Sequence, residues 1–347
     1  MKVLLVSPVP PPSGGIARWT ERYLKWCSGK HEVEVVNTAL IGIRSGQAGK
    51  KKKIYDELRR SIKILRCTKK AIKNNPDIVH LNTSCSKTGI IRDWLCAREA
   101  LKKNVPFVLH CHCNIKDQLG IGFLPNILFN NLLRNASIIF VLNENSKVFV
   151  ESIVGKEKLF TCPNFVLENQ LKVNHVINNS INSIIYVGDV RLSKGTDDIF
   201  KLAKMLPDKD FKIVGSITDE IKRMQKPKNI ILLGRKSAKE VEKELELADI
   251  FLFPSLTEGF SNALLEAMAV GLPVIATDVG ANKEMIESNG GYIVSVHDIL
   301  AMKKSIEKME NPVIRKQMSI WNIEKVRSTY TYDKVLNMIF NKYEDII

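Results

Sequence analysis

The chain has 347 residues, of which 45% are hydrophobic, and a formal net charge of +15 at pH 7. This length and apolar content suffice for a sizeable core and favour two domains. The positive charge indicates an anionic partner, such as a nucleotide sugar, a nucleic acid or an acidic membrane face. The seven cysteines are an odd number without a C-x-x-C pair, so neither a disulfide framework nor a zinc ribbon is expected.

The sequence contains no segment typical of secretion or of membrane insertion. The amino-terminal run M-K-V-L-L-V-S-P is too short for a signal peptide. No apolar run reaches the roughly 18 residues that a spanning helix needs. We therefore expect a reduced, cytoplasmic location, and a peripheral position at the inner face of a membrane is the alternative that stays open.

In the first half of the chain, short apolar runs alternate with amphipathic stretches. Such runs, rich in β-branched residues and bounded by turn residues, predict buried parallel strands with helices between them. The expected strands are Lys2–Val6, Val33–Val36, Ile78–Leu81, Phe107–Leu109 and Ile138–Leu142, and the expected helices are Ala17–Cys27, Tyr55–Lys73, Trp94–Lys103 and Asn126–Leu133.

The same alternation begins again in the second half and predicts a second sheet. Its expected strands are Ile184–Val187, Phe211–Val214, Ile230–Leu232, Ile250–Phe253 and Val274–Ala276. Two series of alternating strands and helices indicate an α/β protein with two doubly wound, Rossmann-like domains. The asparagine-rich stretch Pro163–Ser183 reads as the linker. We assign residues 1–165 to the first domain and 166–329 to the second, and expect a helix over 330–347 to cross back to the first.

The segment F-P-S-L-T-E-G-F-S-N-A-L-L-E-A-M-A-V-G, Phe253–Gly271, is the strongest candidate for a ligand site. A strand leads into a loop that holds Glu258, and the following helix carries Glu266. The amino terminus of a helix presents unpaired N–H groups that suit phosphate. A carboxylate such as Glu266 can accept two hydrogen bonds from the vicinal diol of a ribose.

This segment resembles the E-x7-E signature of retaining GT-B glycosyltransferases of family 4. The run E-G-F-S-N-A-L-L-E-A-M-A-V-G-L-P-V-I-A-T carries the resemblance, with A-D-I-F-L-F-P-S before it and T-D-V-G-A-N-K-E after it. The resemblance implies a GT-B fold with two domains facing across a cleft. It also implies that Glu266 binds the ribose and that Glu258 lies by the donor sugar. The diphosphate would meet backbone N–H groups in the run Gly259, Phe260, Ser261 and Asn262.

A second loop, G-D-V-R-L-S-K-G, supplies positive charge for the same ligand. Lys194 is a mobile point charge and Arg191 a planar fork, and both suit a diphosphate leaving group. The loop of the family reads G-R-L-x-x-x-K-G. Lys194 keeps its spacing from Gly188, whereas Asp189 stands at the arginine position, so the role of Arg191 stays open. The loop Leu233–Lys236, with Arg235, is expected to lie near the base of the nucleotide.

Two features of the first half complete the candidate site. The run P-P-S-G-G-I before a helix matches a family loop beside the donor phosphates and sugar, which implies a role for Gly14 and Gly15. In L-H-C-H-C-N, the period of two puts His110 and His112 on one face of a strand and the two cysteines on the other. The family has a histidine next to the reacting sugar, and His112 is the better match. Ligands on opposite faces make a shared metal site geometrically poor.

The sequence Asp208-Lys209-Asp210 matches D-x-D, the metal motif of another glycosyltransferase fold, but its place at a turn before a strand favours a solvated turn. We therefore expect no metal and no cofactor. Charge on the leaving diphosphate would then be neutralised by Lys194, Arg191 and the helix terminus, which makes electrostatic stabilisation the main catalytic contribution.

The basic helical segment Gly49–Lys73 places Ile54, Leu58, Ile62, Leu65 and Ile72 on one stripe. One interpretation packs this stripe on the first sheet, and the other brings the basic face, Lys50–Lys73, to anionic lipid headgroups. Nucleic acid is not expected, because no aromatic residues interleave with the charges.

Together the motifs predict a retaining, metal-independent glycosyltransferase with His112, Lys194 and Glu258 as its catalytic residues. It would move a sugar from a UDP- or GDP-sugar to a hydroxyl of a lipid-linked polysaccharide or glycolipid, with the acceptor on the first domain and the donor on the second. The alternatives are a sugar-nucleotide epimerase on the same scaffold and a basic membrane-surface protein without catalysis. A dehydrogenase is not supported, because no G-x-G-x-x-G follows either opening strand.

Overall fold

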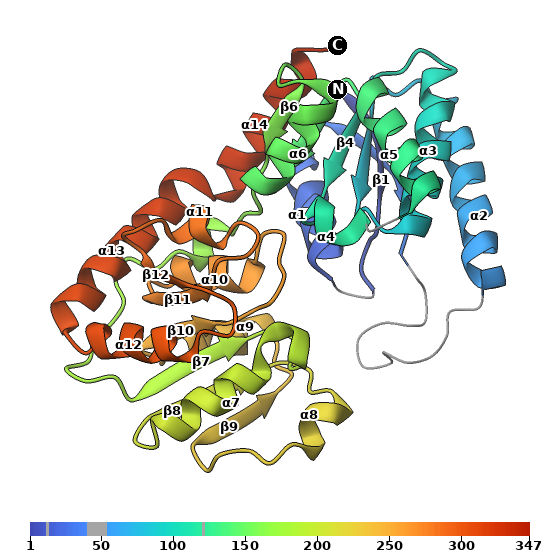
Figure 1. Cartoon of the computed structure of the whole chain (residues 1–347). Coiled ribbons are helices and arrows are strands. Elements are labelled where there is room, and N and C mark those ends of the chain that lie inside the picture. The colour runs from blue at the N-terminus through green and yellow to red at the C-terminus, as the bar shows by residue number, and fades with distance from the viewer. Residues whose placement is uncertain (12–13, 40–53, 120–121) are drawn as a thin grey trace. The chain divides into compact units, whose positions relative to one another are not determined.

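The computed structural model describes residues 1–11, 14–39, 54–119 and 122–347. The chain divides into two compact units, the first formed by Met1–Pro163 with Asp333–Ile347 and the second by Asn164–Tyr332. Each unit is built on a six-stranded sheet in which every strand pairing is parallel (Figure 1). The predicted α/β class with two Rossmann-like domains is confirmed. None of the helices in the described ranges combines the length and the apolar character needed to cross a membrane.

The sheet of the first unit has the strand order β2-β1-β3-β4-β5-β6. Its strands are β1 (Lys2–Ser7), β2 (Glu32–Asn37), β3 (Ile78–Thr83), β4 (Phe107–Cys111), β5 (Ile138–Val141) and β6 (Leu159–Thr161). Its helices are α1 (Gly15–Cys27), α2 (Ile54–Ile72), α3 (Lys87–Leu101), α4 (Ile115–Leu119), α5 (Phe123–Asn135), α6 (Glu144–Val154) and the carboxyl-terminal α14 (Tyr332–Glu344).

Both faces of this sheet are covered, but by different chemistry. Helices α2, α3, α5 and α6 enclose an apolar core with side chains such as Leu109 and Cys111 (Figure 1). The other face carries a cluster of aromatic and histidine rings, to which α1 and α14 contribute. Tyr23 of α1 stacks on Phe340 of α14 with 5.7 Å between ring centroids. The carboxyl-terminal helix therefore belongs to the packing of the first unit, as the predicted fold requires.

The inner face of α2 differs from the predicted one. Leu58 and Ile62 were expected in the stripe that packs on the sheet, yet they are 59% and 43% exposed. The inner positions near the start of the helix hold an ion pair instead, with 2.6 Å between Arg60 and Glu57. Further along, buried residues such as Ile64 face the core. The expected charges at Lys50–Lys53 and the side chain of Ile54 lie outside the described residues.

The sheet of the second unit has the order β12-β11-β10-β7-β8-β9. Its strands are β7 (Ser183–Val187), β8 (Asp210–Val214), β9 (Ile230–Gly234), β10 (Ile250–Phe253), β11 (Val274–Thr277) and β12 (Gly291–Val294). Its helices are α7 (Thr196–Met205), α8 (Asp219–Arg223), α9 (Ala238–Glu246), α10 (Asn262–Ala269), α11 (Asn282–Ile286), α12 (Ile299–Met309) and α13 (Pro312–Thr329). The chain runs outward from β7 to β9 and then returns to place β10 on the other side of β7.

This return creates a topological switch point between β7 and β10. The two strands pair directly, with Ile250 opposite Ile184. In open α/β sheets, the loops that leave two such strands diverge over opposite faces, and ligands bind in the crevice beyond their carboxyl ends. The two loops that the sequence singled out, Gly188–Gly195 and Pro254–Ser261, follow β7 and β10 and therefore meet at this point.

Replacing Ile339 of α14 by alanine tests whether the carboxyl-terminal helix is part of the first core. Ile339 is fully buried, and a large-to-small change at such a site costs about 2–5 kcal/mol of unfolding free energy. We expect that loss in urea unfolding of the full chain. Asn341→Ala, at an exposed position of the same helix, is the matched control. Equal unfolding midpoints for Ile339→Ala and the wild type would show that α14 does not stabilise the unit.

Candidate functional site

The candidate site of the second unit centres on an ion pair between two loops. The ammonium of Lys194 lies 2.5 Å from Oε1 of Glu258, and both side chains are largely buried, with 18% and 13% exposure. Ser255 donates a hydrogen bond of 2.8 Å to the same oxygen. Lys194 also donates to the carbonyl of Thr257 at 3.4 Å. The structure thus brings together two residues that the sequence places 64 positions apart.

Helix α10 begins immediately after this loop and directs its first N–H groups to the same edge of the sheet. Ser261 caps the helix, since its side chain accepts from the N–H of Leu264 at 3.2 Å. The N–H groups of the first turn have no acceptor within the helix, because their partners would precede its start. The ring of Phe260 packs edge-on against Tyr330 with 5.5 Å between centroids. Only the backbone of Phe260 is therefore placed to meet a phosphate.

Two glycines allow the close approach of the backbone that this loop pair needs. Gly195 has φ +72°, and a Cβ there would lie 2.0 Å from the carbonyl oxygen of Pro254. Gly280, in the loop after β11, has φ +55°, and its Cβ would lie 2.4 Å from the carbonyl oxygen of Glu258. The N–H of Ala281 also donates to the carbonyl of Gly259 at 3.0 Å. Gly280 therefore supports the Glu258–Gly259 backbone from behind.

The other residues predicted to bind the nucleotide-sugar donor lie around this ion pair and differ in how deeply they are buried. Arg191 is exposed, and its carbonyl accepts from the hydroxyl of Thr196 at 3.0 Å. Arg235 is exposed at the carboxyl end of β9, two strands away from β7. Glu266 is partly buried one turn inside α10. All three lie at or near the carboxyl edge of the sheet, so the structure gathers the predicted set on one side.

Tyr186 and Ser255 are residues of this site that the sequence did not single out. Burial, followed by the carboxylates of Glu258 and Asp189, raises the pKa of Tyr186 well above its usual range, so the phenol stays protonated. Its hydroxyl donates to the carbonyl of Asp189 at 2.9 Å and so holds the loop after β7. The strand period of two could have indicated that Tyr186 shares a sheet face with Ile184.

In the first unit, the predicted residues lie at the carboxyl edge of its sheet. Gly14, partly exposed, precedes α1 at the amino cap, and Gly15 is exposed as the first helical residue. Ser13 lies outside the described residues. His112 follows β4 and continues the ladder, since its N–H donates to the carbonyl of Thr83 at 2.9 Å. Its side chain is partly buried, and burial lowers its pKa to about 3, so the ring is neutral near pH 7.

The two histidines of this strand end have different surroundings. The rings of His110 and His112 stack with 3.9 Å between centroids. His110 is fully buried, and neither of its ring nitrogens has a hydrogen-bond partner among the described residues. Burial lowers its pKa well below the usual range. His112 is therefore the one of the two that a ligand could reach.

Two further polar residues, His80 and Asn82, lie beside these histidines and were missed by the sequence analysis. Both are on β3 and buried. Oδ1 of Asn82 lies 3.0 Å from Nε2 of His80 and 2.8 Å from Nε2 of His112. The run I-V-H-L-N-T has the same period of two as L-H-C-H-C-N, which is the signal that could have found them.

Cys111, the last residue of β4, and Cys113 just beyond it point away from this cluster, as the strand period predicts. Cys111 and Cys113 belong to the apolar core under α2, α3, α5 and α6. All seven cysteines are free thiols. A joint metal site of the two histidines and two cysteines is therefore wrong on geometry, because the sheet separates them.

The D-x-D sequence lies at the amino end of β8, opposite the edge that holds Lys194 and Glu258. Lys209 pairs with Asp208 at 3.4 Å and with Glu310 at 2.6 Å, and Asp208 is 69% exposed. The carboxylate of Asp208 is thus paired on the protein itself. Neither carboxylate of the D-x-D sequence can contact a ligand at the carboxyl edge of the same sheet, because both lie at its amino edge.

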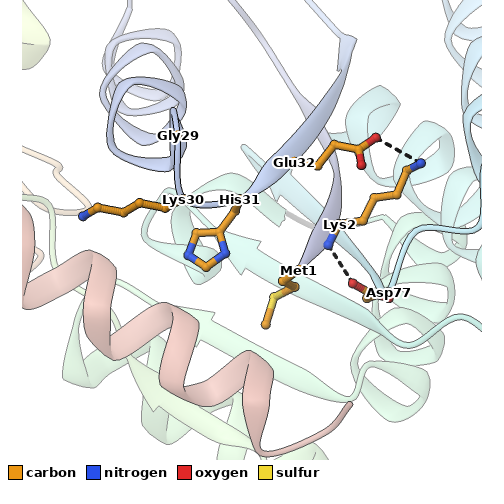
Figure 2. Close-up of a pocket in the computed structure, with 7 residues that line it drawn as sticks. All are labelled: Met1, Lys2, Gly29, Lys30, His31, Glu32 and Asp77. Carbon is orange, nitrogen blue, oxygen red and sulfur yellow. Dashed lines mark hydrogen bonds and ion pairs between the residues drawn. The ribbon is translucent and has the colours of Figure 1, made fainter.

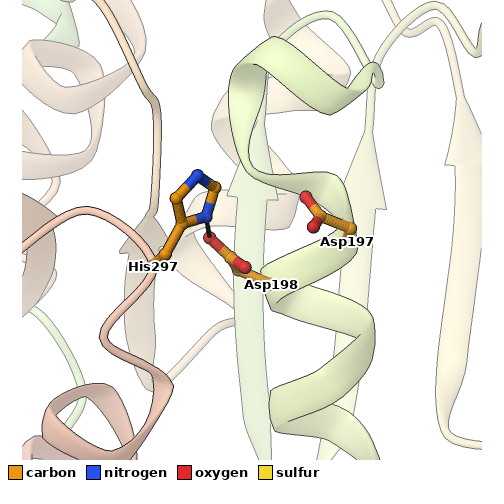
Figure 3. Close-up of side chains that lie close together, drawn as sticks. All are labelled: Asp197, Asp198 and His297. Carbon is orange, nitrogen blue, oxygen red and sulfur yellow. Dashed lines mark hydrogen bonds and ion pairs between the residues drawn. The ribbon is translucent and has the colours of Figure 1, made fainter.

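Among the described residues, one group of side chains has metal-ligand spacing: Asp197, Asp198 and His297 (Figure 3). Nδ1 of His297 lies 2.8 Å from the buried carboxylate of Asp198. Lys201 lies 3.1 Å from Asp197 and 3.4 Å from Asp198. The ammonium of Lys201 therefore already neutralises these carboxylates. We conclude that the group anchors α7 rather than binding a metal ion.

A pocket of about 480 Å³ opens at the amino edge of the first sheet (Figure 2). Lys2 pairs with Glu32 at 3.0 Å across it, and the N–H of Lys2 donates to Asp77 at 2.6 Å. Lys2 and Glu32 are the first residues of β1 and β2, and Asp77 directly precedes β3, whereas His112 and Gly14 lie beyond the carboxyl ends of their neighbouring strands. The pocket is therefore separate from the candidate site.

Comparison with known proteins places this geometry in a family context. A family model described as glycosyl transferases, group 1, matches residues 168–322. Residues 168–322 are therefore similar to group 1 glycosyl transferases. The matched residues contain the Lys194–Glu258 pair and the amino terminus of α10.

Relatives across more of the chain are also similar to it. The alpha-galactosylglucosyldiacylglycerol synthase of Streptococcus pneumoniae is 28% identical over 64% of this chain and 64% of its own length. An Escherichia coli UDP-Gal:alpha-D-GlcNAc-diphosphoundecaprenol alpha-1,3-galactosyltransferase is 25% identical over 79% of this chain and 77% of its own. The crystal structure of Anabaena HepE in complex with UDP covers 100% of both chains with a TM-score of 0.78 at 15% identity. These similarities support a glycosyltransferase and match the GT-B fold.

Replacing Gly280 by alanine tests the support of the Glu258–Gly259 backbone. Gly155→Ala is the matched control, because Gly155 also has positive φ (+75°) but nothing within 4 Å of a Cβ. The control should lose about 1–3 kcal/mol of unfolding free energy from its backbone conformation alone. Gly280→Ala should lose a further 1–3 kcal/mol, roughly, because its Cβ overlaps a carbonyl oxygen. Equal losses in urea unfolding would contradict the close approach.

Proposed function

We propose that the protein is a retaining glycosyltransferase that moves a sugar from a nucleotide diphosphate donor, UDP- or GDP-linked, to a hydroxyl of a lipid-linked polysaccharide or glycolipid. One observation carries the proposal: a lysine, a glutamate and a capped helix terminus converge at the β7–β10 switch point, within the residues that match the group 1 glycosyl transferases. A lysine ammonium and helix N–H groups together suit a diphosphate.

Different groups would hold the ribose, the diphosphate and the base of the donor. Glu266 would accept from the ribose hydroxyls, and the N–H groups from Gly259 to Asn262 would bind the diphosphate. Lys194 would exchange part of its contact with Glu258 for the phosphate. Its ammonium has three N–H donors, and the described contacts to Glu258 and Thr257 use two of them. Arg191 and Arg235 would contribute to phosphate and base binding from exposed positions.

Transfer would depend on electrostatic stabilisation of the departing diphosphate. Lys194, Arg191 and the first turn of α10 would neutralise its growing charge, an effect worth several kcal/mol where donors are preorganised. We propose attack from the face of the leaving group, with the diphosphate taking the acceptor proton, and no covalent intermediate. Glu258 and His112 would orient the sugar, and no metal would be required.

The names of the relatives support the substrate classes. One relative is named for UDP-Gal and a diphosphoundecaprenol-linked sugar, and another for the synthesis of alpha-galactosylglucosyldiacylglycerol. HepE was crystallised with UDP. We assign the donor to the second unit, which holds the Lys194–Glu258 pair, and the acceptor to the first, and we propose a cytoplasmic location.

A lipid-linked acceptor would bring the first unit to a membrane, and its surface fits that role. Phe123 and Leu124, at the start of α5, are 85% and 56% exposed, and Leu58 on α2 is 59% exposed. Helices α2, α3 and α5 lie side by side, and α2 carries several lysines and arginines (Figure 1). Exposed apolar side chains beside basic ones are typical of peripheral contact with anionic lipid.

Lys194→Ala and Glu266→Ala test the donor site. We expect transfer, or hydrolysis of the donor, to fall by about 10²–10³ in kcat for Lys194→Ala, because a preorganised charge is removed from the leaving group. Glu266→Ala should abolish most of the thermal shift caused by the cognate nucleoside diphosphate in a screen of UDP, GDP and ADP. Lys239→Ala, at an exposed position of α9, is the control.

Wild-type rates in both variants would refute this assignment. A product whose anomeric configuration differs from that of the donor sugar would contradict retention, and loss of activity with a chelator would contradict metal independence.

A Phe123→Ser/Leu124→Ser double variant tests the membrane surface. Vesicles with about 30% anionic lipid should bind the wild type, and each buried aromatic or leucine side chain contributes roughly 1.5–3 kcal/mol. The double variant should therefore bind at least about tenfold more weakly. Val148→Ser is the control, since Val148 is 57% exposed on α6. Equal co-sedimentation of the double variant and the wild type would exclude this surface.

A further inference from the structure

The buried polar network around Asn82 has hydrogen bonds whose directions can be worked out. It begins at the backbone carbonyl of Ile16, which can only accept, and Thr20 donates to it at 2.9 Å. Thr20 has one proton, so the 2.5 Å contact between Ser7 and Thr20 requires Ser7 to be the donor. Ser7 must then accept from Nδ2 of Asn82, 2.9 Å away.

This direction fixes the orientation of the Asn82 amide. With Nδ2 on Ser7, Oδ1 faces the two histidines, at 3.0 Å from Nε2 of His80 and 2.8 Å from Nε2 of His112. An amide oxygen can only accept. Both histidines therefore carry a proton on Nε2.

The far side of His80 agrees with this assignment. Burial lowers the pKa of His80 to about 3, so its ring holds a single proton and Nδ1 is an acceptor. The hydroxyl of Tyr343 on α14 lies within hydrogen-bond distance of that nitrogen and must be the donor. Tyr343 is fully buried. The carboxyl-terminal helix thus completes a network that ends at His112.

His112 is left with one open nitrogen. Its Nδ1 has no hydrogen-bond partner among the described residues, and the ring is partly exposed at the carboxyl edge of the sheet. The stack on His110 and the edge contact with Trp19, at 5.2 Å between centroids, hold the plane of the ring. An uncharged ring with its proton on Nε2 offers only a lone pair at Nδ1.

We propose that Asn82 is a positioning residue that fixes His112 in its Nε2–H tautomer, so that Nδ1 accepts a hydrogen bond from a hydroxyl of the transferred sugar. The identity of the ligand group rests on the proposed function, whereas the tautomer rests on the network alone. An acceptor without charge selects an O–H donor and disfavours a carboxylate, which can only accept. The site therefore suits a neutral hexose better than a uronic acid at this position.

The tautomers can be read directly by nitrogen NMR on the full chain with 15N-labelled histidine, of which there are six. We expect His80 and His112 both to be neutral with Nε2 protonated near pH 7. Asn82→Asp should keep this pattern, because it keeps the acceptor. Asn82→Leu, which removes the acceptor, should give His112 a mixture of tautomers.

A wild-type His112 protonated on Nδ1 would overturn the proposal, and this measurement does not depend on any variant folding. An unchanged tautomer in Asn82→Leu would also overturn it. Transfer should fall roughly tenfold in Asn82→Leu, the factor for one lost hydrogen bond, and recover in Asn82→Asp. Because the tautomer is read without substrate, its failure leaves the proposed function standing, and an inactive enzyme with the expected tautomer would contradict the proposed function alone.

Discussion

The parallel pairing of β7 with β10 is the constraint on which the candidate site depends. The strands after β7 are added on one side of it up to β9, and β10 then pairs on its other side. The loops that follow β7 and β10 therefore leave from adjacent carboxyl ends. A lysine from one loop and a glutamate from the other can then approach to 2.5 Å although they are far apart in sequence. The glycines at 195 and 280 make this approach possible, since a side chain at either position would overlap backbone. The strand order thus brings the charged groups and the start of α10 together at one place.

In the first unit, the surrounding residues keep the neutral ring of His112 oriented at the edge of the sheet. The ring of His112 contacts Trp19 on α1 and the buried amide of Asn82 on β3. Burial lowers the pKa of His112, so its ring carries only one proton near pH 7. The amide oxygen of Asn82 accepts from Nε2 and therefore keeps that proton on Nε2. Tyr343 contributes from the opposite end of the chain. Truncation of α14 would therefore affect both the stability of the unit and the histidine network.

Periodicity predicted most of the fold, because buried parallel strands are continuous apolar runs. It missed β6 and β12, which are short edge strands; β12 opens with Gly291, whose glycine neighbour made the run look like a turn. The predicted stripe on α2 holds at Ile72, which is buried, but was wrong at Leu58 and Ile62, because an ion pair of Glu57 with Arg60 takes the inner positions there. Motif spacing predicted Lys194 and Glu258, but the network through Asn82 depends on which strands become neighbours, and that is set by tertiary packing.

Hydrogen exchange with and without nucleoside diphosphate tests the central claim most directly, because it locates the ligand without requiring turnover. The account predicts slower amide exchange in residues 188–195 and 258–266 when the cognate diphosphate is bound, since those N–H groups would bind phosphate or lie beneath it. The turn at Asp208–Asp210 and the pocket formed by Lys2 and its neighbours should exchange at unchanged rates. Protection confined to either of those places, with none at the start of α10, would contradict the account.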